Sequence, residues 1–149
     1  MSTHPPFGTQ LVGQTENAFG AILDRELTGT RLSRAHWIAL TVTVTSGGTL
    51  DRDALAGRLA RALKLTPAEA DERLDGLAST GLIARATTPG SPVSATDAGV
   101  RLHARIHAAV AEVTERLWGD LPAEDLATAG KVLATVLERA NRELERDRR

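Results

Sequence analysis

The chain has 149 residues, of which 42% are hydrophobic and 25% are charged, and its formal net charge is −1. This size and composition are typical of one soluble globular domain, with or without a small extension, and the near-neutral charge leaves only local patches to support nucleic-acid binding. Cysteine is absent, which excludes disulfides, thiolate zinc sites and thiol redox switches.

Two amphipathic helices are predicted at the start of the chain. Apolar residues between Leu11 and Leu27 recur at steps of three and four, and Gly29 ends this first helix. Ser33 is a typical capping residue directly before the second helix, which starts at Arg34. The stretch "TVTVT" at 41–45 is β-branched throughout and alternates as a strand does. Five residues are too few to decide by pattern, and we predict helix.

Two further helices and a hairpin follow. Asp51 caps a short helix whose apolar face is made by Leu55, Leu59 and Leu63. "TPAE" at 66–69 is a capping box with proline at the first helical position, and Gly81 ends the helix that it starts. Residues 82–86 are predicted as a strand, 87–92 as a tight turn and 93–95 as a candidate returning strand.

Two long helices complete the chain, one opened by Thr96 with Asp97 and the other by Pro122. Short helices followed by a two-stranded hairpin describe a winged helix, a variant of the helix-turn-helix. The first helix and the last two have more apolar surface than this small core covers, and a second copy of the chain is the simplest partner. The predicted fold class is therefore mainly α with a small β-hairpin wing. We expect a single domain over 1–149, with a winged helix-turn-helix lobe at about 33–95 and long dimerisation helices at about 8–28 and 96–147.

Four stretches of the chain resemble a known family in order and spacing. They are "LSRAHWIAL" at 32–40, "LDRDALAGRL" at 50–59, "LTPAEADERLDGLASTGLI" at 65–83 and "VSATDAG" at 93–99. With them the chain resembles, over nearly its whole length, the multiple-antibiotic-resistance regulator (MarR) family of bacterial transcription factors. The resemblance implies a homodimer built from the terminal helices, two winged-helix lobes on a roughly palindromic operator, and a ligand crevice between the dimer helices and each lobe.

Two segments depart from that family in a direction that opposes DNA binding. Where the family's wing tip holds an arginine for the minor groove, the tip at 87–92 has none. The expected recognition helix carries four acids against one base, Arg73, and acids repel a polyanion; the acids are Glu69, Asp71, Glu72 and Asp75. An acid that faces the bases can, however, accept a hydrogen bond from the cytosine amino group and select that base. Two further alternatives are that the capping box occupies Glu69 and that the other acids point away from the groove.

Basic residues around this helix supply the predicted DNA contacts. They form a basic rim if the fold gathers them, or otherwise a solvated surface paired with acids; they are Arg34, Arg52, Arg58, Arg61, Lys64, Arg73 and Arg85. We predict phosphate contacts from Arg58, Lys64 and Thr66, and base-facing positions for Glu69 and Glu72. The complete predicted DNA-binding set is Arg34, Arg58, Lys64, Thr66, Glu69, Glu72, Arg73, Arg85, Thr87 and Thr88.

The resemblance also implies an effector site along the second helix, faced by the first and fifth helices. Trp37 would stack on an aromatic effector, and His36 would pair with a carboxylate or change its charge near neutral pH. The predicted effector-binding set is Phe19, His36, Trp37 and His107. The alternative is that Trp37 belongs to the core and Phe19 to the core or the dimer interface.

Metal, catalytic and membrane functions find little support. His103 and His107 share a helix face at metal-binding spacing, but two ligands do not make a site, and we predict surface or interface histidines without metal or cofactor. The sequence has no phosphate-binding glycine loop or nucleophile elbow, so no catalytic residue and no enzyme activity are predicted.

"MSTHPPFG" lacks the regions of a signal peptide, and no apolar run reaches the ~18 residues that span a bilayer. We expect a cytoplasmic protein with no membrane partner.

These observations predict a homodimeric regulator of the MarR type that binds double-stranded DNA, as a repressor relieved by a small aromatic or acidic effector. The effector would favour a lobe separation that no longer matches successive major grooves, which recur every ~34–36 Å. The alternative is a degenerate winged-helix dimer with weak or no DNA binding that acts as a ligand-binding or protein-interaction module.

Overall fold

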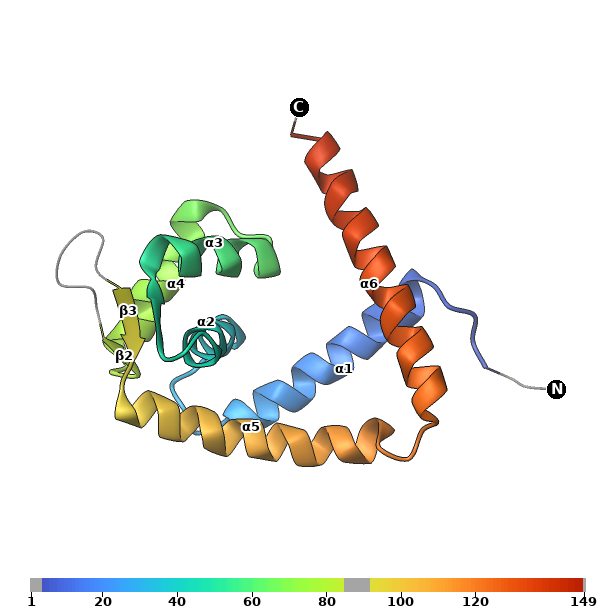
Figure 1. Cartoon of the computed structure of the whole chain (residues 1–149), viewed down its shortest axis with the longest axis horizontal. Helices are drawn as coiled ribbons and strands as arrows, with labels where there is room; N and C mark the ends of the chain where they lie inside the picture. Colours follow the sequence, from blue (N-terminus) through green and yellow to red (C-terminus); the bar gives the residue numbers. More distant parts are fainter. Residues whose placement is uncertain (1–3, 85–91, 149) are drawn as a thin grey trace. The chain divides into compact units, whose positions relative to one another are not determined.

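The computed structural model describes residues 4–84 and 92–148. Residues 1–110 form one compact unit and residues 111–149 a second. The first unit contains α1 (Thr9–Leu27), α2 (Arg34–Thr45), β1 (Thr49–Asp51), α3 (Arg52–Leu63), α4 (Pro67–Ser79), β2 (Ile83–Ala84), β3 (Pro92–Ala95) and the beginning of α5 (Asp97–Trp118) (Figure 1). The second contains the rest of α5 and α6 (Ala123–Arg146). None of the helices described has the length and apolarity needed to cross a membrane.

Three helices begin at the capping residues that the sequence predicts. At the start of α3, the Asp51 carboxylate accepts a hydrogen bond from the Ala54 backbone N–H at 3.0 Å. Ser33 with His36 closes a capping box on α2, and Thr66 with Glu69 closes one on α4. Each cap satisfies backbone donors that the first helical turn leaves unpaired, a contribution of about 1 kcal/mol.

Residues 41–45 are helical, as predicted, despite their β-branched alternation. Helix α2 continues to Thr45. The hydroxyls of Thr43 and Thr45 donate to the carbonyl oxygens of Ala39 and Thr41, one turn earlier, both at 2.8 Å. Because the helix itself satisfies these hydroxyls, it accommodates threonine even at position 43, which is fully buried.

The strands form a three-stranded antiparallel sheet instead of the predicted two-stranded hairpin. Its order is β1-β3-β2, with Leu50 opposite Val93 and Ile83 opposite Ala95. Strand β1 is not predicted from the sequence because its three residues are too few to show an alternating pattern. The strand predicted at 82–86 is present at Ile83–Ala84; residues 85–86 and most of the predicted turn lie outside the described residues.

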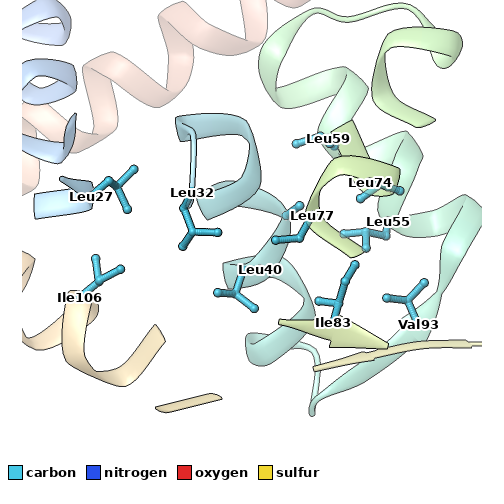
Figure 2. Packing of buried hydrophobic residues seen from close by; sticks show 11 residues of the cluster. Leu27, Leu32, Leu40, Leu55, Leu59, Leu74, Leu77, Ile83, Val93 and Ile106 are labelled. Carbon is cyan, nitrogen blue, oxygen red and sulfur yellow. The ribbon is translucent and has the colours of Figure 1, made fainter. Parts of the chain in front are cut away.

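The core of the first unit lies where α2, α3 and α4 meet the sheet (Figure 2). Five leucines from the three helices are completely buried there: Leu40, Leu55, Leu59, Leu74 and Leu77. Ile83 and Val93 add the contribution of the sheet. Each side chain of this kind stabilises the fold by about 1.5–3 kcal/mol relative to its exposed state. The shared core therefore holds helices that are too short to be stable alone.

Thr96 and Gly99 fix the start of α5 against the preceding segment. The Thr96 hydroxyl accepts from the Gly99 N–H at 3.1 Å and donates to the Gly81 carbonyl at 2.8 Å. A Cβ atom at Gly99 would overlap the carbonyl oxygen of Leu82. Only glycine fits this close approach of two backbones, which explains "TDAG" at 96–99 in physical terms.

Helix α6 has an uncovered apolar stripe. None of its residues is buried, and Leu133, Val136 and Leu137 are 46%, 42% and 60% exposed. Leu126 and Leu144 continue the same face at helical spacing. An apolar stripe of this length is stabilised when a second surface covers it.

Candidate nucleic-acid interface

One face of helix α4 packs against the core, and the opposite face is exposed. Its buried residues Ala70, Leu74 and Leu77 face the core beside α2 and α3. The period of the helix places Ala68, Glu72 and Ser79 on the opposite side, where all three are exposed. The outward face of the expected recognition helix therefore holds two small side chains and one long acidic one.

Two of the four acids on α4 are paired with an arginine at the first position of α3. The Arg52 guanidinium lies 3.2 Å from a carboxylate oxygen of Asp75 and 3.7 Å from one of Asp71. Both carboxylates are more than half exposed, so the pairs contribute at most ~1 kcal/mol to stability. Their main consequence is electrostatic, because Arg52 offsets negative charge on the side of α4 that faces α3.

A third acid, Glu69, is part of the N-terminal cap of α4. Its carboxylate accepts from the Thr66 backbone N–H at 3.1 Å, and its own N–H donates to the Thr66 hydroxyl oxygen at 3.2 Å. The hydrogen bond from the Thr66 backbone is the main cause that lowers the pKa of Glu69. Glu69 therefore stays ionised at the positive end of the helix dipole, the place where a phosphate would otherwise bind.

The predicted phosphate-contacting residues lie on α3 and in the turn that leads to α4. Arg58 is exposed on α3 and donates to the Ser46 hydroxyl at 3.2 Å. Lys64 follows α3 with a left-handed backbone, φ 57, and Thr66 caps α4 two residues later. Arg73 is half-buried on α4, where its charge contributes to lowering the pKa of both Glu69 and His36.

Arg34, another predicted DNA contact, is instead engaged by α1. Arg34 makes a two-pronged ion pair with Asp24 of α1, at 2.9 and 2.7 Å, and its hydrogen bond is the main cause that lowers the pKa of Asp24. Arg34 thus joins α2 to α1. Arg85, Thr87 and Thr88 lie outside the described residues.

The predicted effector residues do not all lie together: Trp37 and His107 belong to a stack with α5, whereas His36 faces α4. Trp37 stacks on His103 of α5, with ring centroids 4.9 Å apart, and His103 stacks in turn on His107 at 5.6 Å. His36 instead belongs to the α2 capping box, and its Nε2 lies 3.0 Å from the point that a Cβ at Gly76 of α4 would occupy. Phe19 is 43% exposed on α1.

His103 lies between Trp37 and His107 in this stack, although it is not in the predicted effector-binding set. It is 7% exposed, and its Nε2 has no hydrogen-bond partner within the described part of the chain. Burial is the main cause that lowers its pKa, with His107 second, so its ring is neutral at pH 7. Among the described residues, no three His, Cys, Asp or Glu side chains lie close enough to hold a metal.

Comparison with known proteins identifies the fold. The sequence matches no protein-family model and no curated protein, but many solved structures match the architecture. Transcriptional regulator PA3341 shares 26% identity over 89% of this chain and 97% of its own, with a TM-score of 0.73. MepR of S. aureus, solved in complex with DNA, shares 17% identity over 91% and 99% of the two chains, with a TM-score of 0.74. PcaV of Streptomyces coelicolor, solved with its natural ligand, shares 20% over 94% and 99%, with a TM-score of 0.69. Others are described as MarR-family transcriptional regulators.

The chain has the MarR fold. The helices together with the small antiparallel sheet match the winged-helix architecture of this fold, so the prediction of fold class is confirmed. The matching proteins are described as transcriptional regulators, which agrees with the predicted class of function. Their coverage of nearly the whole chain shows that the long helices α1, α5 and α6 belong to the same fold.

Two residues gain a role that sequence reasoning did not assign. The sequence presents Arg52 only as one of seven basic residues, although Asp71 and Asp75 lie one helical turn apart and so form a double acceptor. His103 entered only as half of a possible metal pair, although its four-residue spacing from His107 already placed both on one helix face. In both cases the sequence shows the spacing of the residues within one helix. It does not show the partner on another helix, which is Arg52 of α3 for the two acids and Trp37 of α2 for His103.

Proposed function

We propose that this protein is a homodimeric, DNA-binding transcriptional regulator of the MarR type, with the chain as one functional domain. The observation that carries the proposal is the match of nearly the whole chain to a structure solved on DNA. A bacterial regulator of this kind works in the cytoplasm, where its DNA lies.

The charges around α4 support DNA binding better than the sequence suggests. Residues 52–79 contain five basic and five acidic side chains, so the segment is neutral overall. Three acids of α4 are occupied by Thr66 and Arg52, which leaves Arg58 and Lys64 as the proposed phosphate contacts from α3 and the turn. The Thr66 hydroxyl accepts from Glu69 and retains its own hydrogen for a phosphate oxygen. Arg34, Arg73, Arg85, Thr87 and Thr88 remain proposed members of the interface.

The proposed homodimer places the apolar stripe of α6 against a second copy of the chain. Leu133 and Leu137 would lie near the centre of that contact because they occupy the middle of the stripe. A symmetric dimer covers the same face of both chains at once. It also presents two copies of α4, which is the geometry that a palindromic operator requires.

The proposed effector is a small aromatic or acidic molecule, and the protein is a repressor that this molecule releases. Trp37 and His107 flank His103 in a continuous aromatic stack, a surface suited to a flat ring. Phe19 and His36 remain proposed members of the site. An effector that binds the released state with about 1.4 kcal/mol of extra free energy weakens DNA binding tenfold.

A selection from sheared genomic DNA tests the function. The purified protein is incubated with the fragments at near-physiological salt, and the retained DNA is sequenced. We expect enrichment of a palindromic site. If a folded dimer retains nothing above background, with and without candidate aromatic acids, DNA binding is refuted, and the uncharged or acidic outward face of α4 favours a ligand-binding or protein-interaction module.

A further inference from the structure

Only one of the four acids on α4 is available to a DNA groove. Glu69 is held by the Thr66 backbone at 3.1 Å, and Asp71 and Asp75 are turned toward Arg52. Glu72 lies opposite the buried face, is exposed, and makes no hydrogen bond or ion pair within residues 4–84 and 92–148.

The neighbours of Glu72 on the outward face are too small to prevent a close approach to DNA. Ala68 and Ser79, one turn before and two turns after it, project only a methyl and a hydroxymethyl group. A helix of about 10–12 Å diameter enters a major groove about 12 Å wide. In such an approach, Glu72 is the outward side chain long enough to reach the edges of the bases.

The chemistry of the major groove decides which base this carboxylate accepts. An ionised carboxylate is only a hydrogen-bond acceptor. Guanine presents two acceptors there and thymine an acceptor with a methyl group, so both leave the charge unpaired. Adenine presents an amino donor beside the N7 acceptor, which repels the second oxygen. Cytosine presents its amino donor without that acceptor and is the base that fits.

We propose that Glu72 is a specificity-determining residue that selects cytosine at one position in each half of the DNA site. This inference rests on the proposed function, because it requires that α4 enters the major groove. Glu72 lowers the affinity for DNA of any sequence, because its charge is repelled by the phosphates. At a site with the correctly placed cytosine, the hydrogen bond to the amino group offsets this loss. The acid therefore sharpens the difference between specific and non-specific DNA.

Selection from a random duplex library tests this role with the full-length protein and three variants. Glu72→Gln keeps the length of the side chain, Glu72→Ala removes it, and Asp75→Asn is a control with the same change in charge at a position paired with Arg52. We expect the wild type and Asp75→Asn to select the same cytosine. Glu72→Gln should prefer adenine there, since an amide pairs with adenine N6 and N7, and Glu72→Ala should lose the roughly ten- to hundredfold discrimination.

The outcomes separate this inference from the function on which it rests. If all four proteins select one site with unchanged preference, Glu72 does not select the base, while the DNA-binding function stands. If only Glu72→Gln or Glu72→Ala retains DNA, the carboxylate repels DNA without recognising a base, and the inference is overturned. If none of the four retains DNA although each is folded, the proposed function fails and the role of Glu72 fails with it.

Discussion

Lys64 adopts a backbone conformation that favours glycine. Its φ of 57 is the only positive value among the described non-glycine residues, and it ends α3 just before the capping box of α4. A left-handed conformation costs a residue with a Cβ about 1–2 kcal/mol. A lysine at this position is consistent with selection for its charge beside the proposed phosphate site.

Substitution of Lys64 separates the backbone strain from the charge. Glycine relieves the strain and alanine does not, so we expect Lys64→Gly to be more stable than Lys64→Ala by about 0.5–1 kcal/mol, after the entropy of glycine is deducted. Both variants should reduce the salt dependence of DNA binding by about one phosphate contact. Urea unfolding and binding at several salt concentrations measure these effects, and equal stability of the two variants would argue against strain at Lys64.

Because of His103, we expect the free energy of unfolding to decrease in mild acid. Burial first and His107 second lower its pKa in the folded state, while the unfolded chain keeps the ordinary value of 6.5. Because the folded pKa is the lower one, the contribution is complete above pH 6.5 and is lost as the pH falls through the folded value. His36, whose pKa burial also lowers, acts in the same direction.

Replacement of His103 by phenylalanine tests this assignment. His103→Phe keeps a ring to stack on Trp37 and removes the titration. We expect the free energy of unfolding of the wild type to fall as the pH decreases below about 6.5, and that of His103→Phe to fall less. Denaturant unfolding at each pH measures the difference; identical slopes would assign the acid sensitivity to His36 or to carboxyl groups.

Among the contacts between elements, Arg52 connects α3 to α4 and offsets two of the acids on α4. Arg52→Ala should change stability by less than ~1 kcal/mol because the pairs are partly exposed. It should weaken DNA binding roughly tenfold at low salt, with a smaller effect at high salt, because Asp71 and Asp75 are then uncompensated. Titration of DNA at two salt concentrations measures this. Adding Asp71→Asn and Asp75→Asn should restore affinity, and a failure to restore it would mean that Arg52 contacts DNA itself.

The helices of this fold were largely predictable and the sheet was not. Ser33, Asp51 and Thr66 cap helices within three residues of their own position, so their effect is visible in a short window of sequence. Strand β1 exists because Leu50 pairs with Val93 across a long separation in the chain. Three residues carry no periodic signal, and only the partner strand makes them a strand.

For the whole molecule, substitutions in the apolar stripe of α6 test whether this face forms the proposed dimer interface. Leu133→Glu places a charge within the apolar face, while Thr135→Glu places the same charge on the opposite face of the helix. We expect Thr135→Glu to remain dimeric. Leu133→Glu should raise the dissociation constant of the dimer by more than about a hundredfold, since an unpaired buried charge costs several kcal/mol. Sedimentation equilibrium measures both; a dimer unaffected by Leu133→Glu would place the interface on another surface.

The helices, their caps and their apolar faces can be predicted from the amino-acid sequence alone, because each depends on residues close to one another along the chain. The sequence also shows how many acids α4 carries. Which of these acids are available depends on the three-dimensional arrangement, since Asp71 and Asp75 pair with Arg52 on another helix. The same holds for Trp37 and His103, which stack from α2 and α5. Pairing between elements follows from packing across the core, and no local pattern in the chain specifies it.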